Sequence, residues 1–107
     1  MTTFDEREKG YERKFQHDQE LAFKAKARRN KLFGLWVAGR LGLADDAAEA
    51  YAREIAAADF AKTGDGAIIA RASEELANRG RTVAAERLRA ELDRCAAEAK
   101  RQIGATP

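Results

Sequence analysis

Apolar residues recur along most of the chain at the three- and four-residue spacings of amphipathic helices. Helix-favouring residues run nearly throughout, and the single proline is the last residue. Glycine-containing stretches interrupt the pattern at residues 39–45, 63–66 and 80–82, which are the predicted helix breaks. The sequence therefore predicts four helices, over residues 18–38, 45–61, 66–79 and 82–103.

Each predicted helix has one apolar face that we expect to lie in a shared core. In the first helix, the expected inward residues fall within about 60° of one another on a wheel of 100° per residue. Four such helices with short loops favour the all-α class and a small antiparallel four-helix bundle. In chain order, the expected inward residues are Leu21, Ala25, Leu32 and Trp36; Ala48, Tyr51, Ala52, Ile55 and Ala58; Ile69, Ala72 and Leu76; and Leu88, Leu92, Cys95, Ala99 and Ile103.

The predicted helix ends carry residues suited to capping. Asp45 or Asp46 is the expected N-cap of the second helix, Asp65 of the third and Thr82 of the fourth. Gly80 suits a left-handed C-terminal cap of the third helix.

Residues 1–17 carry a separate pattern. Phe4, Tyr11 and Phe15 lie within about 40° of one another on a helical wheel, in phase with the first helix. Gly10 opposes helix formation by about 1 kcal/mol relative to alanine, and helices this short are marginal alone in water. We expect residues 1–17 to be a mobile segment that becomes helical when a partner covers the aromatic stripe, and residues 18–107 to form the bundle domain. A frayed terminus without contacts is the alternative.

Charge changes abruptly within the N-terminal third. Residues 1–20 hold six acids and four bases, whereas residues 21–40 hold six bases and no acid. A solvated helix face is the default interpretation of this basic run, and a phosphate- or acid-binding patch is the alternative. The net charge of +2 argues against a dedicated nucleic-acid binder. The run consists of Lys24, Lys26, Arg28, Arg29 and Lys31.

The sequence contains few residues that could carry out catalysis. One histidine and one cysteine supply neither a metal cluster nor a Cys–His pair, so we expect no enzyme and no metal site. Cys95 lies on the apolar stripe of the fourth helix and is expected in the core, whereas His17 is expected to be solvated at a helix start. No stretch approaches the roughly 20 apolar residues of a membrane helix, and a lone cysteine fits a reducing cytoplasm.

The first 39 residues closely resemble the zeta subunit of alphaproteobacterial F-type ATP synthases. The resemblance runs through TTFDERE, through the pattern KF-HD-EL-FKA-ARRNKL and through G-W-A, and it becomes loose beyond Arg40. The chain differs from the family at Gly10, where alanine is frequent.

The resemblance implies a small all-α inhibitor of ATP hydrolysis, with a four-helix bundle and a mobile N-terminal inhibitory segment. It implies that this segment inserts as a helix at a catalytic interface between an alpha and a beta subunit, next to gamma. The implied protein is cytoplasmic, peripheral to the inner membrane through the synthase, and monomeric when free. Carried over by position, the implied contacts of the inhibitory segment are Phe4, Asp5, Arg7, Glu8, Tyr11, Lys14 and Phe15.

A helical nucleotide-sensing or protein-binding module without strong inhibition is the alternative function. In that interpretation, Arg28, Arg29 and Lys31 contact the phosphates of weakly bound ATP or ADP. We expect no other cofactor.

Overall fold

The computed structural model describes residues 3–58 and 64–104, and for residues 3–13 and 15 it describes the backbone alone. The described part is all-α and contains no strand. This confirms the predicted all-α fold with four helices. The helices are α1 (Thr3–Arg40), α2 (Asp45–Ala58), α3 (Asp65–Asn78) and α4 (Ala85–Ile103).

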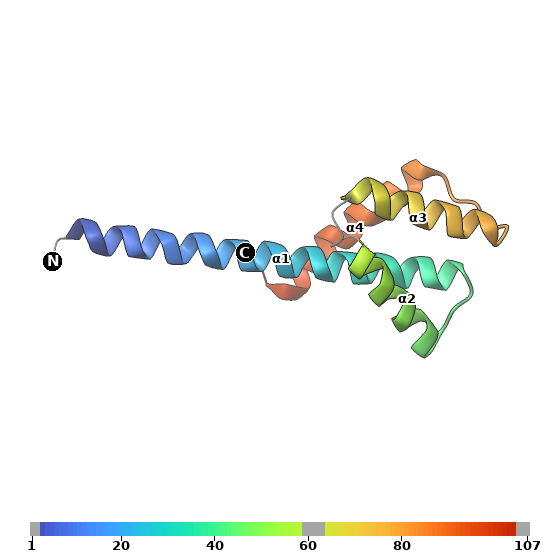
Figure 1. Cartoon of the computed structure of the whole chain (residues 1–107), viewed down its shortest axis with the longest axis horizontal. Helices are drawn as coiled ribbons and strands as arrows, with labels where there is room; N and C mark the ends of the chain where they lie inside the picture. Colours follow the sequence, from blue (N-terminus) through green and yellow to red (C-terminus); the bar gives the residue numbers. More distant parts are fainter. Residues whose placement is uncertain (1–2, 59–63, 105–107) are drawn as a thin grey trace.

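The molecule is elongated because α1 is much longer than the other helices. Its overall dimensions are 66 × 25 × 22 Å. The N-terminal part of α1 extends beyond α2, α3 and α4, which gather around its C-terminal part (Figure 1). In the same view, α3 lies above α1 and α2 is inclined across it, whereas α4 starts beside α3 and crosses α1, so that its C-terminal end lies below α1.

The first helix begins earlier than the predicted residue 18 and passes without a break into residues 1–17 as far as Thr3. At its other end, Gly39 lies inside the helix, whereas Gly42 has a left-handed φ of 85°. The Leu43 amide donates to the Ala38 carbonyl at 2.9 Å and the Gly42 amide donates to the Gly39 carbonyl at 3.1 Å. This pair of bonds forms a Schellman motif, which satisfies the last carbonyls of α1.

The other helix ends lie within a few residues of their predicted positions. The last described residue of α2 is Ala58, and residues 59–61 of the prediction lie outside the described residues. Gly80 has a φ of 68°, and the Arg81 amide donates to the Leu76 carbonyl at 2.8 Å. The predicted left-handed cap of α3 is therefore confirmed.

Two predicted N-caps are wrong. The N-cap of α3 is Gly64, without a side-chain bond, because the carboxylate of Asp65 is hydrogen-bonded to Arg29. The N-cap of α4 is Ala84 rather than Thr82. Between the turn at Gly80 and α4, Val83 packs against the core, so α4 begins only at Ala85.

The predicted apolar faces of α2, α3 and α4 are confirmed with small exceptions. Ala48, Ala58 and Ile103 are half-buried rather than buried, and Ile68 is buried although its position was not predicted. The buried residues that the sequence predicted are Tyr51, Ala52, Ile55, Ile69, Ala72, Leu76, Leu88, Leu92, Cys95 and Ala99.

The predicted face of α1 is only partly right. Ala25 is buried, but its predicted companions Leu21, Leu32 and Trp36 are half-buried. Among the described side chains of α1, the fully buried apolar residues are instead Phe33, Val37 and Ala38. Because α1 packs against both α2 and α4, its buried positions spread around the helix and do not follow one stripe.

Gly34 permits the close crossing of α1 and α2. A Cβ atom at this position would lie 2.7 Å from the Cα atom of Ala52. Such a contact is shorter than any normal van der Waals separation, so the backbones approach this closely only because residue 34 has no side chain.

Candidate functional site

The segment predicted to be inhibitory lies in the projecting part of α1 (Figure 1). Its backbone is helical from Thr3 through Gly10 and onward into the bundle. This is the conformation that the resemblance implies for the inserted segment. That the segment is helical only with a partner stays a prediction. Of the predicted contacts, Lys14 is exposed, and the side chains of Phe4, Asp5, Arg7, Glu8, Tyr11 and Phe15 lie outside the described residues.

The projection joins the bundle between residues 20 and 25. The described side chains from Lys14 to Glu20 are exposed, and Ala25 is the first buried one. Between them, Phe23 keeps 61% of its surface exposed. The segment predicted to be inhibitory and the described residues of α1 that are buried in the bundle therefore lie in different parts of one helix.

A forked ion pair ties α1 to the start of α3. Arg29 Nη2 lies 2.8 Å from Asp65 Oδ1, and Nη1 lies 3.1 Å from Oδ2. The Arg29 side chain is 13% exposed and the Asp65 side chain 40%. The hydrogen bonds from Arg29 hold the pKa of Asp65 below its ordinary value. Because both oxygens are engaged, the pair fixes orientation as well as distance.

Asn30, next to this pair, is fully buried. Its Oδ1 atom accepts a hydrogen bond from Arg29 Nε at 2.9 Å. A buried amide is costly without such partners, so Arg29 serves two polar groups at once. Sequence reasoning missed Asn30, although a polar residue just before the apolar run from Leu32 is a signal that could have drawn attention to it.

The C-terminal end of α1 is held by arginines from the turn after α3. Arg81 Nη1 donates to the Arg40 carbonyl at 2.6 Å, and Arg79 Nη1 donates to the Leu41 carbonyl at 3.4 Å. Cationic donors are favourable at a helix C-terminus, where the carbonyl ends carry partial negative charge. The bundle part of α1 is therefore held at two places, at its C-terminal end and at Arg29.

Comparison with known proteins decides what this long helix belongs to. The chain matches the family described as ATPase inhibitor subunit zeta over residues 1–102. It belongs to this family. The match includes the projecting part of α1 as well as the bundle. No curated protein matches the chain.

Membership in the zeta family confirms the resemblance of the N-terminal third and extends it through the bundle. The family consists of regulatory, non-catalytic inhibitor subunits, so this chain is not an enzyme. Its family supports an inhibitory role and implies that it binds the ATP synthase. No helix within residues 3–58 and 64–104 is both long and apolar enough to cross a membrane.

The three residues suggested for phosphate binding have different surroundings in the structure. Arg28 is exposed, whereas Arg29 is held by Asp65. Lys31 Nζ lies 3.6 Å from Glu49 Oε2 on α2. The structure thus places two of the three beside carboxylates, and a nucleotide contact stays a prediction.

The remaining candidate residues for chemistry or titration are Cys95 and His17. Cys95 is buried, and burial, with a smaller contribution from Glu91, raises the pKa of its thiol to about 11. Its predicted place in the core is confirmed. His17 is exposed, as predicted, but it lies inside α1 and not at a helix start. Within the part of the chain that the structure describes, no group of three His, Cys, Asp or Glu residues is arranged to hold a metal ion.

Proposed function

We propose that the chain inhibits ATP hydrolysis by inserting residues 1–17 as a helix at a catalytic alpha/beta interface of the ATP synthase, next to gamma. The observation that carries the proposal is the continuity of α1, which runs from Thr3 into the bundle without a break. A helix already anchored at its base loses less freedom on insertion than a free peptide of the same length.

The dimensions of the molecule support insertion to a limited depth. At 1.5 Å per residue, residues 3–20 extend about 27 Å. The bundle behind them is broad, since the two shorter dimensions of the molecule are 25 and 22 Å. A single helix of about 10–12 Å diameter fits between subunits far more easily than a bundle. The bundle therefore remains outside the alpha/beta interface and limits how far the helix enters.

The aromatic stripe supplies the affinity of the inserted helix. Phe4, Tyr11 and Phe15 share one helical face by their spacing, so a partner surface covers all three together. Buried aromatic anchors dominate the energetics of many interfaces. A helix wedged at a catalytic interface obstructs the opening and closing that each hydrolysis cycle requires.

Hydrolysis by the cognate synthase head, titrated with the chain, tests this proposal. The triple variant Phe4→Ala/Tyr11→Ala/Phe15→Ala should inhibit at least about tenfold more weakly than the unmodified chain, because it loses three aromatic anchors. Arg53→Ala, which changes an exposed residue of α2, is the matched control and should inhibit normally. Equal inhibition by the triple variant and the control would contradict the proposal.

A further inference from the structure

Phe23 lies on the surface at the base of the projection. Its exposed fraction of 61% makes it the one exposed large apolar residue in the described part of the chain. A single exposed aromatic ring is common on protein surfaces. Phe23 is informative because of the residues around it.

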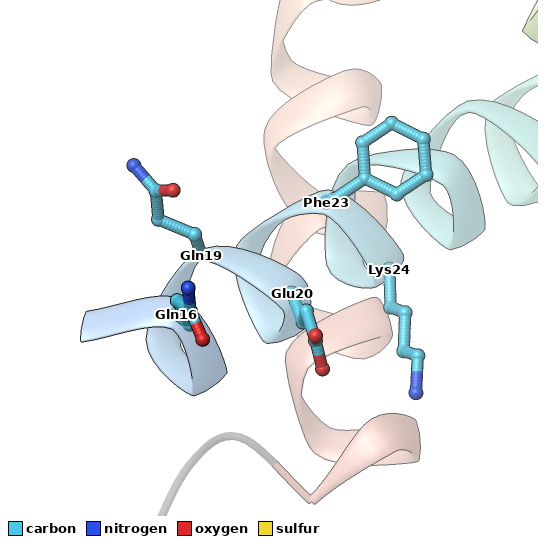
Figure 2. Close-up of a pocket in the computed structure, with 5 residues that line it drawn as sticks. All are labelled: Gln16, Gln19, Glu20, Phe23 and Lys24. Atoms are coloured by element: carbon cyan, nitrogen blue, oxygen red, sulfur yellow. The ribbon is translucent and has the colours of Figure 1, made fainter. Parts of the chain in front are cut away.

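Two shallow hollows meet at Phe23 and Lys24. One lies toward the tip of α1 and is lined also by Gln16, Gln19 and Glu20 (Figure 2). The ring of Phe23 is directed away from the helix axis in this view. The other hollow lies toward the bundle, where Ile103 of α4 closes it. We call the surface around this second hollow the Phe23 face: Phe23, Lys24, Ala27, Arg28 and Lys31 of α1.

The Phe23 face is positively charged. Lys24, Arg28 and Lys31 follow one another at spacings of four and three residues, and residues 21–40 contain no acid. In the part of the chain that the structure describes, no ion pair joins Lys24 or Arg28 to a carboxylate. Lys31 has a partner in Glu49, but its side chain is still 43% exposed. An apolar ring bordered by unneutralised bases suits an acidic partner with an apolar recess.

We propose that the Phe23 face is a second docking surface, which binds an acidic surface of the synthase head at the mouth of the interface that residues 1–17 enter. This inference rests on the proposed function, which supplies its partner, the synthase head. It follows from the continuity of α1: when the tip is inserted, the Phe23 face is the next part of the helix to reach the partner.

Charge complementarity favours an acidic partner over a second copy of the chain. Two copies of the chain meeting symmetrically through the Phe23 face would oppose like charges, which is unfavourable. An acidic protein surface neutralises them and accelerates encounter at low ionic strength. The Phe23 face thus steers the chain to the head, and the aromatic stripe of residues 1–17 holds it there.

Affinity of the full-length chain for the isolated synthase head tests the Phe23 face. We expect Lys24→Glu/Arg28→Glu to raise the Kd about tenfold or more at low salt and to flatten its salt dependence. Phe23→Ala should raise the Kd about tenfold, and Phe23→Leu should recover most of the loss. Arg53→Glu, a charge reversal on an exposed residue of α2, is the control and should change the Kd by less than about twofold. Circular dichroism verifies that each variant is folded.

The outcomes separate this inference from the proposed function. At saturating concentrations, the Phe23-face variants should still inhibit hydrolysis fully, because residues 1–17 are unchanged. Inhibition by the unmodified chain combined with unaltered Kd values for both face variants would overturn the Phe23 face and leave the proposed function standing. Weakened binding of the face variants, combined with binding but no inhibition by the unmodified chain, would support the face and overturn the proposed function. No binding at all, or a dimer of the free chain that Phe23→Ala abolishes, would overturn the assigned partner.

Discussion

Single residues determine how closely and in what orientation the helices join. Gly34 lets α1 cross α2 at backbone contact with Ala52. Arg29 connects the buried Asn30 to Asp65, and so links the middle of α1 to the first turn of α3. Both features lie in the part of α1 that anchors the projection.

Glycine-to-alanine substitutions at two positions of α1 should have opposite effects. Gly34→Ala should lower the free energy of unfolding by about 1–3 kcal/mol, because its Cβ would collide with the backbone of Ala52, which cannot move aside alone. Gly39→Ala meets nothing within 4 Å and should raise that free energy by up to about 1 kcal/mol through helix propensity. Urea denaturation measures both. Equal stabilisation by the two substitutions would show that the close crossing is absent.

The ion pair between Arg29 and Asp65 should give stability a pH dependence. The folded state lowers the pKa of Asp65, so the pair stabilises the fold above the ordinary aspartate pKa and loses this effect as pH falls below about 4. Solvent screens the partly exposed carboxylate, so Asp65→Asn should cost about 1 kcal/mol at pH 7. The difference between the two proteins should shrink at acidic pH in thermal unfolding. A difference that does not change between pH 7 and pH 3 would contradict this assignment.

These residue-level contacts could not be predicted from the sequence. The sequence marks Asp65 as polar at a helix start, for which an N-cap is the local interpretation. The observed role depends on Arg29, which is 36 positions away and is brought close only by the tertiary fold. The role of Gly34 likewise depends on the position of α2, which the local sequence does not reveal.

At the scale of the element, α1 combines an anchored half with a projecting half. The faces of α2, α3 and α4 were predictable because each helix buries one side. The face of α1 was not, because α2 and α4 cover different sides and bury Phe33, Val37 and Ala38 as well as Ala25. Its aromatic stripe lies in the half that contributes no residue to the described core.

Under the proposed function, Gly10 is the position in α1 where helix propensity should affect the strength of inhibition. Because the segment is predicted to become helical only with a partner, Gly10→Ala removes about 1 kcal/mol of its ordering cost and should strengthen inhibition by up to about fivefold. Gly39→Ala makes the same change in the same helix outside the segment, so it should leave inhibition unaltered. Titration of ATP hydrolysis measures both variants. If Gly10→Ala leaves the inhibition constant unchanged, ordering of the segment does not limit binding.

At the scale of the whole molecule, the proposed function gives the bundle and the projection separate roles. The described core lies entirely at Ala25 and beyond, so removal of the tip leaves its packing intact. The family match spans both parts, so the bundle and the projecting helix both belong to the inhibitor family. In the proposed function, the bundle positions the helix and limits its entry, and the tip performs the inhibition.

The most direct test is ATP hydrolysis by the cognate synthase head with the full chain and with a chain lacking Met1–Phe15. Circular dichroism and thermal unfolding should first show that the shortened chain keeps a folded bundle. The account predicts that the full chain inhibits hydrolysis and that the shortened chain does not inhibit at any concentration up to a large excess over the head. Undiminished inhibition by the folded, shortened chain would contradict the account.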